Sequence, residues 1–241
     1  MTALVRAELL RLRTSRSTWA LLAVAVTVSG LRMAMVLAGA GSIEGAGSGS
    51  DDQRELLVGA GAHAALLLSA VYGVLLVTGE LASWTLTASL LITPDRRRVV
   101  LAKVMAGAAA GALVATSLLA LGIGVAAAAG GGTDVGLRPL VGTVLMAAGS
   151  GAIGVGVGTV VRQQTAAVAV PVLWFLVLET LLSGFQLSWL QPWLPGGALA
   201  ALSGARFAGS LPMAAAAGVV VAYAAALLLP GARSLLRRDV V

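Results

Sequence analysis

The segment GELASWTLTASLLITPDRRRVVLAK, residues 79–103, is a polar and basic insert between two long apolar runs. Residues 56–78 precede it and residues 99–129 follow it, and each run reaches the length of about 20 residues that a helix needs to cross the hydrocarbon core. The pattern predicts that the chain leaves the membrane between two spans, forms a short polar structure and returns.

The composition of the whole chain agrees with a membrane protein. Of its 241 residues, 59% are hydrophobic and 11% are charged, whereas soluble domains carry about 25% charged residues. Four further apolar runs cover residues 19–40, 139–161, 166–185 and 211–231. We therefore expect one all-α, polytopic membrane domain, residues 1–241, with six transmembrane helices.

A cleavable leader is the alternative for the first run, which ends in Ala38-Gly39-Ala40. The run is about twice as long as the 7–15 apolar residues of a signal peptide, and it contains Arg32. We expect a retained helix.

The basic residues indicate how the chain is oriented. Six spans place both termini on one side, and a cytoplasmic N-terminus puts twelve basic residues inside: Arg6, Arg11, Arg13, Arg16, Arg96, Arg97, Arg98, Lys103, Arg162, Arg233, Arg237 and Arg238. Only four then lie outside or in the outer half: Arg32, Arg54, Arg138 and Arg206. Because cytoplasmic loops are enriched in Lys and Arg, both termini are predicted to be cytoplasmic. The same bias explains the net charge of +6 without a nucleic-acid partner.

The chain contains few of the polar residues that catalytic sites use, which argues against an enzyme. The chain has no cysteine, and His63 is its only histidine, so metal and nucleophilic sites would depend on one ring. Ala148 stands two residues before Ser150, at the position where an intramembrane serine protease has glycine. The only lysine, Lys103, follows Ala102 and not the glycine of a phosphate-binding loop. We expect no enzyme, cofactor or metal site here; a hydrolase that uses His63 is the less favoured alternative.

The insert itself predicts a surface helix over residues 80–92. Glu80 in its first turn would suit the positive end of the helix dipole, and Glu80, Trp84, Thr87 and Leu91 share one face. Pro94 ends the helix. A connector that lies on the membrane surface is the simplest interpretation of these residues alone.

Several motifs together point to a family. The insert carries Gly79-Glu80, Thr85, Thr87-Ala88, Leu90-Leu91, Thr93-Pro94, Arg96, Arg98-Val99 and Ala102-Lys103. With Glu8 to Trp19 at the N-terminus, Glu179 in the fifth span, Trp193-Leu194-Pro195-Gly196 after it and Arg237 to Val240 at the end, it resembles the permeases of ATP-binding cassette (ABC) type-2 exporters. The excess of Arg over Lys is typical of high-GC bacteria.

The resemblance implies a permease subunit of a bacterial plasma membrane that pairs with a second permease copy and with two cytoplasmic ATPase subunits, which bind ATP and Mg. It implies that residues 1–17 form an amphipathic entry helix, that residues 80–92 form a cytoplasmic coupling helix, and that residues 186–210 form outer re-entrant or interfacial helices. The residues expected to face the ATPase are Glu80, Trp84, Thr87, Arg96, Arg11 and Arg13. A non-transporting anchor for an ATPase, in signalling or peptide immunity, is the rival function.

Ionisable residues within the spans are the other candidates. Arg32, His63 and Glu179 lie at similar depth in the outer half, where a charge near the centre costs about 2.5–3.5 kcal/mol. Pairing of Arg32 with Glu179 and separate snorkelling are both open. By resemblance, the second and fifth spans line the transport cavity, so His63, Trp174 and Glu179 are candidate lining residues.

Small residues and one proline predict how the spans pack. Gly107 and Gly111, and Gly154 and Gly158, have the four-residue spacing that lets helices approach closely. We expect these contacts within one subunit. Pro171 should kink the fifth span or loosen its first turns.

The charge count predicts the topology directly. Cysteines introduced at Ser48 and at Arg97 in this cysteine-free chain should react with an impermeant thiol reagent from outside and from inside the cell, respectively. Labelling of both positions from one side contradicts the six-span topology.

Overall fold

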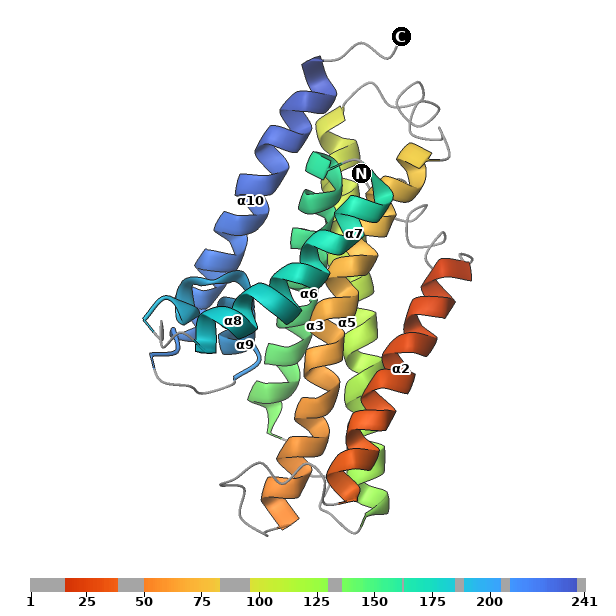
Figure 1. Ribbon diagram of the computed structural model, residues 1–241, viewed down its shortest axis with the longest axis vertical. Helices are drawn as coiled ribbons and strands as arrows, with labels where there is room; N and C mark the ends of the chain where they lie inside the picture. The colour runs from red at the N-terminus through yellow and green to blue at the C-terminus, as the bar shows by residue number, and fades with distance from the viewer. Residues whose placement is uncertain are drawn as a thin grey trace.

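The computed structural model describes residues 16–38, 50–82, 96–129, 136–161, 163–184, 189–204 and 209–237, and within these ranges all regular structure is helical (Figure 1). The longer helices are α2 (Arg16–Leu37), α3 (Ser50–Ala82), α5 (Arg96–Ala128), α6 (Leu137–Val161) and α10 (Met213–Arg237). The fifth span comprises α7 (Gln164–Leu173), the π-helix η1 (Trp174–Leu178) and α8 (Glu179–Gly184). The 3-10 helix η2 (Gln191–Trp193) and α9 (Pro195–Leu202) follow it.

Among the residues that the structure describes, six helices are long and apolar enough to cross a membrane, as the sequence predicts. The spanning segments are Thr18–Leu37, Gly61–Glu80, Val99–Ala128, Leu137–Val161, Gln164–Leu182 and Met213–Gly231. The helices α3 and α5 contain 33 residues each, or about 50 Å at 1.5 Å per residue. Because the hydrocarbon core is about 30 Å thick, both helices continue beyond it.

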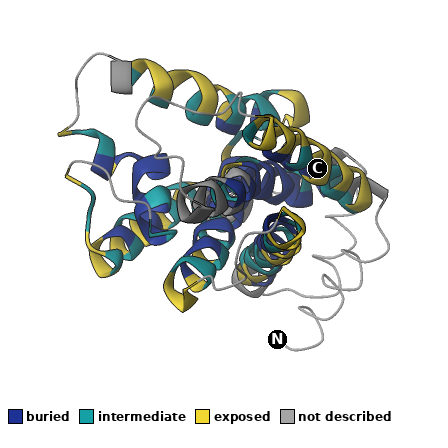
Figure 2. Cartoon of the chain, turned by 90° about the horizontal axis from the view of Figure 1, so that it is seen from below, coloured by how far each residue is buried: buried dark blue, intermediate teal, exposed yellow. Residues whose placement is uncertain are grey.

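The centre of the bundle is formed by α3 and α6. In each of them 61% of the spanning window is buried, compared with 17% in α2 and 11% in the fifth and sixth spans. Figure 2 shows the buried residues gathered on the inward sides of the helices, while the outer helices turn exposed residues outward. The helix α5 packs against both central helices, so α3, α5 and α6 form a three-helix core.

Glycines set the spacing within this core. A Cβ atom added to Gly154 on α6 would overlap the backbone of Ala70 on α3, and one added to Gly111 on α5 would overlap the carbonyl of Ala147 on α6. Gly107 and Gly151 meet each other across the same α5–α6 contact. The prediction that the spaced glycines pack within one subunit is confirmed, because they let backbones approach where a side chain would hold them apart.

The chain after the fifth span folds back against the bundle. The helix α9 lies against α6 and α10, and nearly all of its residues are buried. In Figure 1, α8 and α9 lie well short of the lower ends of α3 and α5. Trp189 and Trp193 at the outside of this segment are exposed. Residues 186–210 thus contain short helices, with η2 and α9 in their described part.

The fifth span is the only described span that changes helix type. Pro171 is buried inside α7, and its ring removes one backbone donor. The helix then opens into the π-helical turn Trp174–Leu178 before α8 resumes. The first turns of the span are regular α-helix, so the predicted loosening there is wrong; the irregular turn begins three residues after the proline.

Replacing glycines by alanine should distinguish the effect of close helix packing on stability from the effect of helix propensity. Gly154→Ala should lower stability by about 1–3 kcal/mol, because its Cβ meets backbone that cannot move cheaply. Gly124→Ala in α5, where nothing lies within 4 Å, should be neutral or stabilising by up to about 1 kcal/mol. Thermal unfolding of both variants in one detergent tests the contrast; equal effects would show that the α3–α6 contact is not close.

Candidate functional site

The described spans contain two acidic residues, Glu80 and Glu179, one in each half of the bundle. Their carboxylates have different kinds of partner. Glu80 lies at the end of α3 that leads to the insert, and Glu179 lies at the start of α8. Each carboxylate makes specific contacts with a second element of the fold. These two places contain three of the candidates that the sequence identified, Glu80, Trp174 and Glu179.

Glu80 is not at the start of a new helix, which corrects the sequence prediction. The helix α3 continues through Gly79 to Ala82, so Glu80 lies near a helix C-terminus, where the dipole disfavours a negative charge. A glycine within a helix costs only about 1 kcal/mol, and the packing of α3 on its neighbours offsets that cost. The predicted helix of residues 80–92 therefore does not begin at Glu80, and residues 83–92 lie outside the described part of the chain.

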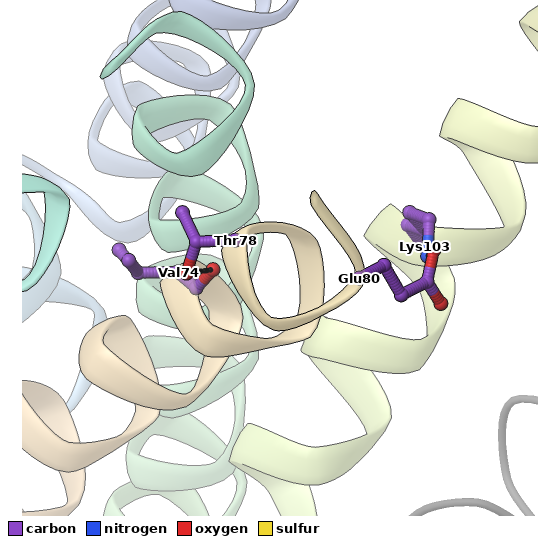
Figure 3. Close-up of polar contacts among 4 residues, drawn as sticks. All are labelled: Val74, Thr78, Glu80 and Lys103. Atoms are coloured by element: carbon purple, nitrogen blue, oxygen red, sulfur yellow. Dashed lines mark hydrogen bonds and ion pairs between the residues drawn. The ribbon is translucent and has the colours of Figure 1, made fainter. Parts of the chain in front are cut away.

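A buried ion pair compensates Glu80. Its carboxylate Oε2 lies 2.5 Å from Nζ of Lys103 on α5, and the side chains are only 2% and 4% exposed. Figure 3 shows Glu80 reaching from the end of α3 toward Lys103 on the neighbouring helix. Removing either partner would leave a buried charge uncompensated, which costs about 3–5 kcal/mol. The pair therefore ties together the two helices that flank residues 83–95.

Near its end, α3 also contains a buried hydroxyl that bonds within the same helix. Thr78 is buried and donates to the carbonyl of Val74 at 3.0 Å, one turn earlier on the same helix. This bond is local and connects no second helix. Around the insert, the described contact between helices that involves charge is thus the one between Glu80 and Lys103.

Glu179 binds the N-terminus of α9. Its Oε1 accepts a hydrogen bond from the backbone N–H of Gly196 at 2.8 Å and another from Nε1 of Trp174 at 2.8 Å. Pro195 at the first position of α9 leaves the next N–H groups free to meet an acceptor. A Cβ atom on Gly196 would overlap the carboxylate, so only glycine permits this approach. The contact fastens the fold-back segment to the fifth span.

The π-helical turn places Trp174 and Glu179 on one face. In an α-helix, residues five apart point in different directions, whereas the i to i+5 bonding of a π-helix stacks them. The backbone N–H of Glu179 bonds the Trp174 carbonyl, and their side chains meet as well. The π-helical turn therefore brings these two candidate residues together, although their spacing of five residues would separate them in an α-helix.

Arg32 and Glu179 do not pair within the subunit. Arg32 is exposed on α2, a helix that packs on α3 and α5, whereas Glu179 faces α9. His63 is exposed on α3 and lies within electrostatic range of Arg32. Of the proposed ATPase-facing residues, Arg96 begins α5, while Arg11, Arg13, Trp84 and Thr87 lie outside the described residues.

Lys103 and Gly196 are the partners that sequence reasoning did not assign. Lys103 is the only lysine in the chain and lies four residues into an apolar span, a position that calls for an acidic partner. Gly196 follows a proline that marks a helix start. The sequence therefore indicates that each of these residues has an acidic partner, but it does not show which acidic residue that is.

Known proteins provide no further assignment. The chain matches no family model and no curated protein.

A double-mutant cycle tests the Glu179 contact. Gly196→Ala should destabilise the fold by about 1–3 kcal/mol through overlap with the carboxylate. Glu179→Ala should cost about 1–3 kcal/mol by leaving the Gly196 N–H without its acceptor. The double variant should be clearly more stable than the sum of the two losses predicts, because removing the carboxylate also removes the overlap. Strictly additive losses in thermal unfolding would contradict a direct contact.

Proposed function

We propose that the chain is the transmembrane permease subunit of an ABC exporter, which works as a dimer with separate cytoplasmic ATPase subunits. The observation that carries the proposal is the buried Glu80–Lys103 pair, which joins the helix ends on both sides of residues 83–95. That insert carries the motif that resembles the coupling loop of type-2 export permeases. A loop that receives force from a partner needs firm attachment to the helices that it must move.

The three-helix core supports this role mechanically. The helices α3, α5 and α6 meet through backbone contacts at Gly107, Gly111, Gly151 and Gly154, and closely packed elements move as units because packed interiors deform little. A displacement of the insert would reach α3 and α5 together through the ion pair and would carry α6 with them. In this mechanism, ATP-driven closure of the ATPases pushes on the insert and on residues 1–17, and the path opens along the axis of the permease dimer.

The outer half supplies the second part of the mechanism. The Glu179 contact fixes α9 and η2 to the fifth span, so the fold-back segment and the fifth span move as one piece. His63, Trp174 and Glu179 remain candidate lining residues of the transport path in the dimer. The partner ATPases hold ATP and Mg; this chain holds neither in the proposal.

The geometry favours the permease over the hydrolase. Ser150 is buried on α6 and donates its hydroxyl to the carbonyl of Leu66 on α3 at 2.6 Å. That bond serves helix packing and directs the hydroxyl to a backbone acceptor, while His63 is exposed on the surface of α3. Transport distinguishes the permease from the anchor, since an anchor would bind an ATPase without moving a substrate.

The first experiment is reconstitution with a co-encoded ATPase. The complex should co-purify, and the permease should stimulate ATP hydrolysis in vesicles. Accumulation of members of a panel of lipids, peptides and drugs is then measured with and without ATP. Failure of any ATPase to associate would overturn the ABC assignment, and association with ATP turnover but no transport would favour the anchor.

The ion pair gives a sharper test of coupling. Glu80→Gln and Lys103→Met should each destabilise the protein by about 3–5 kcal/mol. Glu80→Leu combined with Lys103→Met removes both charges and should restore most of the stability, yet the permease should stimulate its ATPase less than the wild type does.

Thr78→Val is the matched control, because it removes a buried hydroxyl contact at the same helix end without touching the pair. It should cost about 1 kcal/mol and keep the stimulation. Full stimulation in the double variant would reduce the pair to a structural role.

A further inference from the structure

A cavity of about 420 Å³ lies between α2, α3 and α5, away from both candidate sites. Its walls include Trp19 and Leu22 on α2, Leu68 on α3, and Leu113 and Val114 on α5. The helix α2 packs more extensively on α3 than on α5, which leaves this space between α2 and α5 unfilled. The volume falls within the range of about 300–1,000 Å³ that is typical of ligand sites.

The wall of the cavity suits hydrocarbon. None of the described residues that line it carries a charge. Thr18 and Tyr72 place their hydroxyl groups 3.1 Å apart and hydrogen-bond each other, and Ser117 donates to the Leu113 carbonyl at 2.8 Å. The hydroxyl groups in the lining are therefore engaged with protein, and the rest of the wall is aliphatic and aromatic. Apolar cavities of this kind stay dry and bind apolar molecules.

The cavity lies near the middle of the second and third spans. On α5 its lining runs from Ala110 to Ser117, which are each eleven residues from an end of the spanning segment Val99–Ala128. On α3 it includes Tyr72, which lies in the interior of the segment Gly61–Glu80. Eleven residues of helix rise about 16 Å, or about half of the 30 Å hydrocarbon core. The ends of lipid acyl chains lie at this depth, and headgroups do not reach it.

An exposed apolar row leads to the cavity from the end of α5 that is next to the insert. The row consists of Leu101, Met105, Ala109 and Leu113, which follow one another at intervals of four residues. Its three long side chains are each more than half exposed. The helix α2 begins only two residues before Thr18, at the level of the cavity, and in Figure 1 it ends well short of the upper ends of α3 and α5. A chain in the bilayer can therefore follow this row into the cavity without crossing water.

We propose that the cavity binds the terminal part of one acyl chain of a phospholipid in the leaflet next to the insert, and that the rest of this chain follows the exposed row of α5. The length of the path from Val99 to the cavity matches the thickness of one leaflet of hydrocarbon. Because the described wall holds no charge, the chain selects the lipid and the headgroup does not. The site is independent of the exporter assignment and would exist in a transporter and in an anchor alike.

Photolabelling in vesicles tests the site on the intact protein. Phosphatidylcholine vesicles contain a small fraction of phosphatidylcholine with a diazirine either near the end of one acyl chain or near its ester, and adducts are mapped by peptide mass spectrometry. Val221 on α10, which is exposed near the middle of the sixth span, is the reference position. The chain-end probe should label the cavity wall about fivefold more than the reference position.

Depth and headgroup provide two further comparisons. The probe near the ester should label the cavity wall weakly, because about one leaflet of hydrocarbon separates the ester from the cavity. Phosphatidylglycerol with the chain-end probe should label the wall as strongly as phosphatidylcholine does, because no charge in the described wall distinguishes the two headgroups.

Two adjacent residues provide a matched pair of variants. Ser117 and Thr116 are both exposed on α5 and both donate to the Leu113 carbonyl, but Ser117 lines the cavity and Thr116 is not among its lining residues. Ser117→Trp should reduce labelling of the cavity wall about tenfold by occupying the space, and Thr116→Trp should leave it unchanged. Leu113→Trp, at another exposed lining position, is the second blocking variant if Ser117→Trp does not fold.

Five outcomes would overturn the proposal. Equal labelling of the cavity wall and of Val221 would show no site, and stronger labelling of the wall by the ester probe would place the lipid at another depth. A preference for phosphatidylglycerol would show that the headgroup selects the lipid. Unchanged labelling in the blocking variants would place the chain elsewhere. Cross-links from the wall to residues 1–15 or to a second copy, in place of lipid adducts, would assign the space to protein.

Discussion

The close backbone contact of α6 with α3 and α5 is the constraint on which the rest of the structure depends. In a bilayer, apolar side chains gain nothing by leaving lipid for protein, so helices associate through tight packing and polar contacts. Gly151 and Gly154 supply the tight packing, and the bond from Ser150 to the Leu66 carbonyl supplies a polar contact in the same region. With this core fixed, the remaining helices need only one packed side each, which is why α2, the fifth span and α10 remain largely exposed.

The two carboxylates show two ways of accommodating charge in such a bundle. Glu80 lies at the unfavourable end of its helix and is compensated by a full positive charge on Lys103. Glu179 instead meets the favourable end of another helix, where the N–H of Gly196 and the indole of Trp174 donate to it. The first solution joins two long helices of the core, and the second joins a span to a short helix that folds back on it. The end of α3 next to residues 83–95 and the half of the bundle that holds α9 are thus fastened independently.

Much of the fold can be predicted from the sequence, because it depends on the length of apolar runs and on the regular spacing of small residues. Apolar length gives the six spans, and glycine spacing gives the close contacts of α5 and α6. The position of Glu80 does not follow, since the sequence predicts a new helix from residue 80, whereas α3 continues past Gly79 to Ala82. The meeting of Trp174 with Glu179 depends on a π-helical turn, which spacing rules for α-helices do not describe. Pairing across helices, as between Glu80 and Lys103, requires the register of two spans, which composition does not contain.

The buried pair carries the functional argument because stability alone does not require it. Replacing a buried ion pair by well-packed apolar residues is often neutral or even stabilising, so such a pair is weak evidence of a stabilising role. What an ion pair does provide is a specific register of two helices. Lys103 meets the Glu80 carboxylate in one relative position of α3 and α5, whereas apolar contacts would persist if the two helices slid along each other. A chain that must pass a displacement from residues 83–95 into two helices at once needs that register held at the point where the force enters. Close glycine packing between α6 and its neighbours α3 and α5 then carries the same register along the core.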